Sequence, residues 1–194
     1  MTMTITGLFD EYEEARAAVG RLEAAGIASA DISLVANEGA GSVEATEEDA
    51  GKGAGIGAAV GGVGGLLTGL GIMAIPGVGP VIAAGWLATT AAGAVAGAVV
   101  GGAAGGIVGA LTSEGVSEAD AHVYAEGVRR GGALVTARVD DARAAEVREI
   151  LRQGRTIDPI GRRKDYESEG WVNFDENAPV MTSDVVQPLP TFTR

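Results

Sequence analysis

A stretch of 61 residues without one charged side chain, residues 53–113, constrains this chain more than any other feature. Within it glycine recurs at every fourth position in two runs, which are separated by the sequence IPGVGP. Four-residue spacing places these positions on one stripe of an α-helix, where the missing side chains let another backbone approach closely. The runs therefore predict a helical hairpin that turns at IPGVGP and packs through its glycines. The predicted packing positions are Gly53, Gly57, Gly61, Gly65 and Gly69 in the first arm and Gly93, Gly97, Gly101, Gly105 and Gly109 in the second.

The sequence is compatible with more than one medium around this hairpin. Glycine costs about 1 kcal/mol per interior helix position relative to alanine, so such helices need a tight neighbour or an apolar medium. As a helix the first arm, residues 53–74, would measure about 33 Å, against about 30 Å for a bilayer core. The arms have few large apolar side chains, and their flanks are acidic, with Lys52 the only nearby base. Both features weaken the case for insertion into a membrane. The alternatives are a membrane hairpin, a buried or self-assembled soluble hairpin, and a disordered glycine-rich segment.

The segments that flank the uncharged stretch follow the pattern of a mixed α and β domain. TMTITGLF predicts a strand, Asp10 a helix N-cap, and EYEEARAAVGRLEAAG a helix with one apolar stripe. Gly26 ends that helix and DISLVAN predicts a second strand, which completes a β-α-β unit over residues 3–37. The second segment predicts a helix capped by Ser117, a strand ALVTARV, a helix DDARAAEVREILRQG capped by Asp140 or Asp141, and a short strand over residues 156–160.

The fold class follows from a repeat between these two segments. ITGLFDEYEEARAAVGRLEAAG and LVTARVDDARAAEVREILRQG share a strand, an acidic cap and an amphipathic helix. Two β-α-β halves predict an α+β, ferredoxin-like sandwich, interrupted by the long glycine-rich α-helical hairpin. A Rossmann-like arrangement is the alternative, and it needs more parallel strands than the sequence offers. The predicted organisation is a first domain half over residues 1–38, an acidic linker over 39–52, the hairpin over 53–113, a second domain half over 114–161 and a polar tail over 162–194.

Composition excludes several classes of function. With no cysteine and a single histidine, His122, the chain lacks the residues for thiolate or clustered-histidine metal sites and for a cysteine nucleophile. A net charge of -12 would repel nucleic acid phosphates, so we expect no nucleic acid partner. The N-terminus has neither a basic start nor an apolar run of signal-peptide length. We therefore expect a cytoplasmic protein, associated with the inner membrane if the hairpin inserts.

We expect no catalytic residues, no bound cofactor and no metal site. Lys52 precedes most of the glycines, and GAGIGA is an incomplete dinucleotide-binding pattern far from a strand, so a phosphate-binding loop is not predicted. His122 and Tyr124 share a helix without an obvious nucleophile. The acids between Glu44 and Asp49 lack the ligand spacing of a calcium loop and indicate a solvated linker.

Three further side-chain groups have two interpretations each. Arg129 and Arg130 lie at a predicted helix end, where cations favour the macrodipole, and an anion site is the alternative. Trp86 is an interfacial anchor if the hairpin inserts and a core residue if it does not. Trp171 and Phe174 would dock the tail onto the domain or onto a partner chain.

Two segments resemble a known family. GLFDEYEEARAAVGRLEAAGIASADISLV resembles the N-terminal motif of the bacterial general stress protein 17M-like (heat-induced stress protein) domain. The glycine-rich hairpin followed by VYAEGVRRGGALVTARVD is similar to the longer, insert-containing relatives of that family. The resemblance covers residues 4–160 and rests on structural glycines, caps and apolar positions. It implies a stress-associated bacterial protein and brings no catalytic residues to this chain.

These observations together predict a non-enzymatic, general stress-related protein that associates with a membrane or with copies of itself through its glycine-zipper hairpin. The alternative is a soluble oligomeric sensor, in which a ferredoxin-like domain binds a small ligand that the sequence does not indicate. A pocket with converging polar groups would favour the sensor, whereas a general base beside a nucleophile would favour an enzyme.

Overall fold

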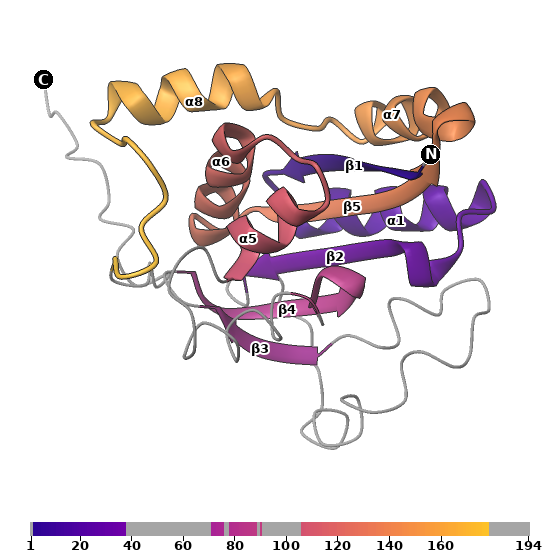
Figure 1. Cartoon of the computed structure of the whole chain (residues 1–194), viewed down its shortest axis with the longest axis horizontal. Helices are drawn as coiled ribbons and strands as arrows, with labels where there is room; N and C mark the ends of the chain where they lie inside the picture. Colours follow the sequence, from indigo (N-terminus) through magenta and orange to yellow (C-terminus); the bar gives the residue numbers. More distant parts are fainter. Residues whose placement is uncertain (1, 38–70, 76–77, 89, 91–105, 179–194) are drawn as a thin grey trace, which may run out of the picture.

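The computed structural model describes residues 2–37, 71–75, 78–88, 90 and 106–178 of the 194-residue chain. Over these residues the protein has an α+β fold, built on one antiparallel sheet with the strand order β1-β5-β2-β4-β3 (Figure 1). The strands are β1 (Thr2–Phe9), β2 (Ile32–Asn37), β3 (Gly71–Ile75), β4 (Gly79–Gly85) and β5 (Ala133–Asp140). The helices are α1 (Tyr12–Ala24), α5 (Gly106–Ser113), α6 (Glu118–Arg129), α7 (Ala144–Gln153) and α8 (Pro159–Ser168), with 3-10 turns at Ser29–Asp31 and Asp141–Arg143.

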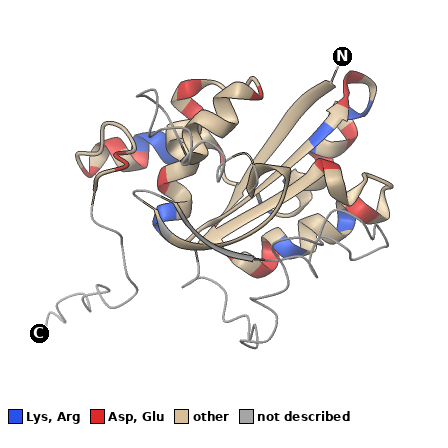
Figure 2. Ribbon diagram, turned by 60° about the horizontal axis from the view of Figure 1, so that its bottom comes forward, with Lys and Arg blue, Asp and Glu red and all other residues tan. Residues whose placement is uncertain are grey.

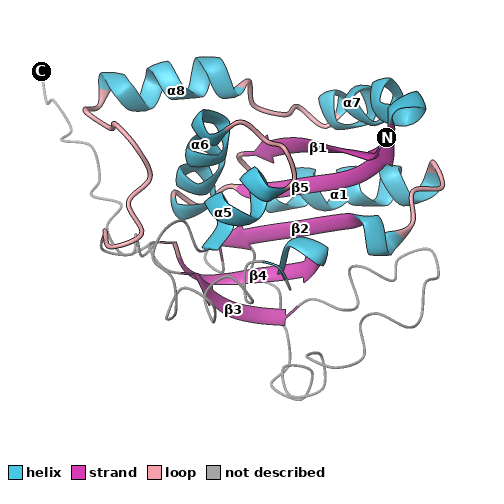
Figure 3. Cartoon of the chain, in the orientation of Figure 1, coloured by secondary structure: helices cyan, strands magenta, loops and turns pink. Residues whose placement is uncertain are grey.

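Helices cover both faces of this sheet (Figure 3). α1 and α7 pack on one face against alternate strand residues such as Ile5, Leu34 and Val135. α5 and α6 pack on the other face, which presents Leu8 and Leu134. Because strand side chains alternate between faces, each central strand contributes to both apolar clusters. Figure 2 shows the charged residues mostly on the helices, away from the middle of the sheet.

The predicted β-α-β unit of the first segment is confirmed. β1 and β2 both run antiparallel to β5, which lies between them, so α1 crosses over one intervening strand. Gly26, with φ of +82°, follows the last turn of α1, as a glycine that ends a helix does. The predicted N-cap is wrong in detail, because Glu11 holds that position without a side-chain bond and Asp10 pairs with Arg162 instead.

The order of elements predicted for the second segment is confirmed as far as its second helix, but the predicted cap of that helix is wrong, because Arg143 holds the N-cap position of α7 and Asp140 makes no side-chain capping bond. Ser117 caps α6 by accepting the Asp120 backbone N–H at 3.2 Å, β5 follows, and α7 begins after the turn at Asp141–Arg143. The predicted strand over residues 156–160 is wrong: Ile157 makes one isolated bridge to Leu8, and the chain then enters α8. The physical reason is local, because Asp158 accepts the N–H groups of Ile160 and Gly161 while proline stands at the first helical position.

Residues predicted as a polar tail belong partly to this helix. α8 continues to Ser168, and its last described neighbours fold back on the domain. Phe174 is buried among the side chains of α5 and α6, and Trp171 makes an edge contact with Tyr166 at a centroid distance of 5.6 Å. The described part of the tail, up to residue 178, therefore packs on its own domain, which is the first of the two interpretations of Trp171 and Phe174.

The uncharged stretch departs most from the prediction. The prediction of a helical hairpin is wrong for residues 71–75 and 79–85, because these residues form the antiparallel strand pair β3 and β4. The predicted turn is confirmed, because Ile75 pairs with Gly79 and accepts the N–H of Val78 at 3.1 Å. β4 in turn pairs with β2 over residues 81–85. β2 gives β4 a ladder of backbone hydrogen bonds and β4 gives one to β3, and these ladders replace the helical hydrogen bonds that the prediction assumed.

The glycine positions themselves fall almost entirely outside the described residues. Gly109 lies within α5, at the end of the uncharged stretch. The other nine predicted packing glycines, namely Gly53, Gly57, Gly61, Gly65, Gly69, Gly93, Gly97, Gly101 and Gly105, and the linker residues 39–52 lie outside the described ranges. Among the helices that the structure describes, none has the length and apolar character needed to cross a membrane.

Candidate functional site

A buried carboxylate near the end of α6 organises the charged groups around it. Glu126 is fully buried and accepts hydrogen bonds from Arg129 (Nε, 2.8 Å; Nη2, 2.6 Å) and from Arg130 (Nε, 2.6 Å). Arg130 also donates to Glu169, beyond the end of α8, at 2.5 Å. The three- and four-residue spacing on one helix brings both arginines to the same carboxylate.

These contacts decide the ionisation of the cluster. Burial alone would raise the pKa of Glu126, but the hydrogen bonds and positive charges of Arg129 and Arg130 outweigh it and hold that pKa below its ordinary value. Burial likewise opposes the charged form of Arg130, whereas its bonds to Glu126 and Glu169 raise its pKa. Glu126 is therefore a permanent anion that fixes two cations at neutral pH.

A polar cavity of about 210 Å³ lies beside this cluster, between the end of β1, α6 and α8. Arg130 and Arg162 reach it from the two helices, and Tyr166 lies between them, with the Arg130 guanidinium carbon 4.2 Å from the ring centroid. Burial raises the pKa of the Tyr166 hydroxyl against the opposing charges of both arginines. Since Asp10 pairs with Arg162 and Glu169 with Arg130, the cavity holds cations that already have counter-ions.

A second cavity, of about 330 Å³, follows the outer edge of β1 between α7 and the segment that leads into α8. Its lining includes Thr6, Tyr124, Arg148 and Asp158. Burial, together with the negative charges of Asp120 and Asp158, raises the pKa of Tyr124 to about 12. Tyr124 is thus a neutral hydroxyl at physiological pH, unsuited to act as a base there.

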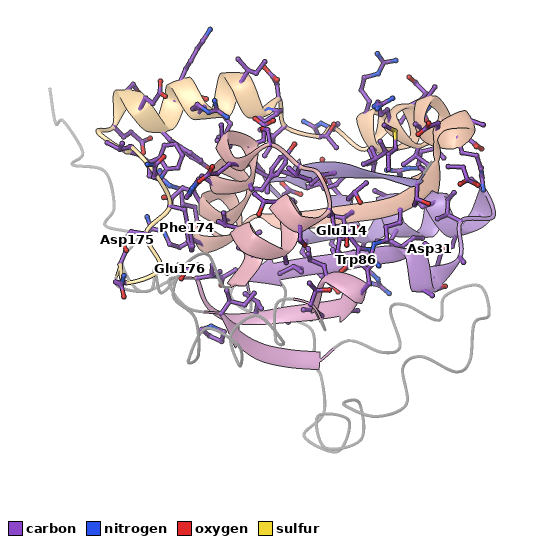
Figure 4. The ribbon with its side chains drawn as sticks, viewed as in Figure 1. Asp31, Trp86, Glu114, Phe174, Asp175 and Glu176 are labelled. Carbon is purple, nitrogen blue, oxygen red and sulfur yellow. The ribbon has the colours of Figure 1, made fainter. Side chains whose placement is uncertain are left out.

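A third cluster joins the sheet to the loop after α5. The Arg138 guanidinium lies 3.6 Å from the ring centroid of Trp86 and donates to both carboxylate oxygens of Glu114, with its Nε at 2.9 Å. Thr4 also donates to Glu114, at 3.4 Å. Figure 4 shows Trp86 and Glu114 on the side of the sheet that carries α5. Trp86 is 8% exposed, so the core interpretation of this residue is the correct one.

His122, which the sequence analysis singled out, lies near acidic side chains of its own helix and of the segment after α8. The Nε2 atom of His122 lies 3.9 Å from a carboxylate oxygen of Glu118 in the same helix. Burial raises the pKa of Glu176, and the charge of His122 opposes that rise. Figure 4 shows Glu176 beside Phe174 and Asp175 in the segment that follows α8. Within the described ranges no group of three or more His, Cys, Asp or Glu side chains is arranged to hold a metal ion.

Sequence reasoning missed Glu126. It placed Arg129 and Arg130 at a helix end as expected, but assigned them to the macrodipole and overlooked the carboxylate three and four residues earlier. The signal was present as the spacing E-x-x-R-R, a pattern typical of ion pairs on one helix face. Glu126 is completely buried in the folded domain, beside Arg130 and Tyr166 of α8, and the local pattern contains no sign of α8.

The chain was compared with protein-family models, curated proteins and solved structures. No protein-family model, curated protein or solved structure matches the chain.

Proposed function

We propose that this protein is a non-enzymatic, general stress-related bacterial protein that associates with copies of itself or with a membrane through its glycine-rich segments. In this proposal the domain is a ferredoxin-like variant whose split β-α-β core, β1-α1-β2 with β5 between the strands, serves as a platform. The cytoplasm, or the cytoplasmic face of the inner membrane, is the proposed location.

The observation that carries the proposal is how firmly the described ends of the uncharged stretch are built into the domain. β4 extends the sheet beside β2, and Trp86 and Leu87 after it are buried. On the other side, Ile107 and Leu111 of α5 are buried in the same apolar cluster as α6. The domain thereby fixes the points at which the glycine-rich residues leave and re-enter it, as a platform for an associating segment requires.

The test replaces one glycine in each run by leucine, Gly61→Leu together with Gly101→Leu. If the glycine stripes pack closely, the added side chains prevent that approach, and the assembly measured by light scattering falls to a smaller species. Membrane association is measured in parallel by retention in a carbonate-washed membrane pellet. The matched control is Ala59→Leu with Ala103→Leu, which adds the same side chains midway between glycines of each run.

An assembly unchanged by the glycine substitutions would contradict the proposal. It would favour the second candidate, a soluble sensor of a small ligand, which the cavity beside Arg130, Arg162 and Tyr166 supports with converging polar groups. Equal loss of assembly in the alanine control would also count against a specific role for the glycines.

A further inference from the structure

The cavity of about 330 Å³ at the outer edge of β1 extends around that edge from one face of the sheet to the other. On one face it is lined by Ile5 and by Leu151 of α7, which belong to the apolar cluster on that side. On the opposite face it is lined by Tyr124 of α6 and by Ile157, which pack in the other cluster. The cavity therefore has two ends, separated by the edge of the strand, and each end has its own chemistry.

The end of the cavity on the α7 face is cationic. Arg148 and Arg152 of α7 both line it. Arg152 pairs with Glu149 of the same helix. Among the described residues, the Arg148 guanidinium has only the Met3 sulfur as a partner, at 3.6 Å. A thioether is a weak acceptor, so Arg148 retains a positive charge and strong donors that suit a carboxylate.

The end of the cavity on the α6 face is anionic. Asp158 lines it and caps α8 by accepting two backbone N–H groups, and it forms no ion pair within the described ranges. Burial, and then the charges of Asp120 and Asp158, raise the pKa of Tyr124, which places its hydroxyl in a negative potential. Asp120 already pairs with Arg163, at 2.9 Å.

Tyr124 is also an unpartnered polar group at this end. It is only 7% exposed, and its hydroxyl makes no hydrogen bond in the part of the chain that the structure describes. A buried hydroxyl without a partner is costly, and a ligand that bonds to it removes that cost. Because the potential there is negative, the fitting ligand group is a positively charged donor, which Asp158 also attracts.

We propose that this cavity binds a linear ω-amino acid, a molecule with a carboxylate and an ammonium group at opposite ends of an unbranched methylene chain. The carboxylate pairs with Arg148, and the ammonium group donates to Asp158 and to the Tyr124 hydroxyl. The methylene chain lies against the apolar side chains of the lining, namely Ile5, Leu151, Ile157 and Pro159. A simple anion leaves Asp158 without a partner, and an α-amino acid carries both charges too close together to reach both ends.

The test titrates the intact chain with ε-aminocaproate and measures binding by saturation-transfer NMR, which observes the ligand whatever the size of the protein assembly. Caproate and hexylamine each lack one charged group, and norleucine is the isomeric α-amino acid. Each of these three is expected to bind about tenfold more weakly than ε-aminocaproate, because one end of the cavity stays unpaired. No saturable binding of ε-aminocaproate, or equal affinity for any of the three, would overturn the inference.

Two substitutions assign the ends of the ligand. Arg148→Gln is expected to weaken ε-aminocaproate and caproate about tenfold and to leave hexylamine unchanged. Asp158→Asn keeps a good N-cap residue for α8 and is expected to weaken ε-aminocaproate and hexylamine while leaving caproate unchanged. Affinities for ε-aminocaproate that neither substitution changes would contradict the proposed site.

Matched controls remove the same charges outside this cavity. They are Arg16→Gln on α1 and Asp165→Asn in the cavity beside Arg130, and both are expected to leave every affinity unchanged. Losses in these controls equal to those of Arg148→Gln and Asp158→Asn would overturn the assignment. The variant with Gly61→Leu and Gly101→Leu is expected to bind ε-aminocaproate as the unsubstituted chain does, which separates this site from association through the glycine-rich segments.

Discussion

Replacing Glu126 by glutamine tests the central claim about the buried charge cluster. The substitution keeps the size of the side chain but removes its negative charge. Arg129 and Arg130, with side chains 11% and 26% exposed, then keep their positive charges without the buried anion that compensates them. Breaking a buried ion pair in this way costs about 3–5 kcal/mol, mainly because an uncompensated charge stays buried.

The exposed partner of the same network gives the matched control. Glu169 is 57% exposed, so Glu169→Gln is expected to cost less than about 1 kcal/mol, as exposed ion pairs do. For a chain of this size, the loss from Glu126→Gln corresponds to a decrease in Tm of about 10 °C. Urea unfolding followed by far-UV circular dichroism measures both free energies of unfolding.

The same cluster predicts a pH dependence. The pKa of Glu126 is lower in the folded chain than in the unfolded chain, so its contribution to stability is present above the ordinary glutamate pKa. That contribution is lost as the pH falls through the folded-state value, and Glu126→Gln should flatten acid unfolding. Equal stability losses for Glu126→Gln and Glu169→Gln, or an unchanged acid transition, would refute the reasoning.

Two further predictions concern Tyr124 and a pair of helical glycines. Because the pKa of Tyr124 is raised to about 12, the contribution of Tyr124 to stability falls as the pH rises above the ordinary tyrosine pKa. Tyr124→Phe should remove the step at highest pH from an absorbance titration of the tyrosines, and a retained step would contradict this assignment. Gly127→Ala should destabilise by about 1–3 kcal/mol, because its Cβ would lie 2.4 Å from the buried Leu8 side chain. Gly20→Ala, with no atom within 4 Å, should stabilise by about 0.5–1 kcal/mol, and chemical denaturation would expose a wrong sign in either case.

The sequence alone determined the elements whose signals are local. Helix α1 with Gly26 after it, the Ser117 cap of α6, strand β5 and helix α7 could all be predicted from apolar period and capping residues. The helix signals suffice because helical hydrogen bonds and caps join residues close in the chain. The alternation of β5 is likewise a local pattern, although its hydrogen bonds go to β1 and β2. The α+β class followed from the order of these elements.

Tertiary structure decided what depends on distant partners. Residues 79–85 form a strand because β2 pairs with them, and residues 71–75 form one because they pair with residues 79–85. The local sequence pattern contains no sign of β2. The chain after α7 makes one bridge, from Ile157 to Leu8, and then enters α8 in place of the predicted strand. Glu126 is a buried anion in the folded domain, where α8 brings Tyr166 and Glu169, the residue after the helix, to the Arg130 that pairs with Glu126. In each case the deciding interaction joins residues far apart in the chain, and it exists only once the domain has folded.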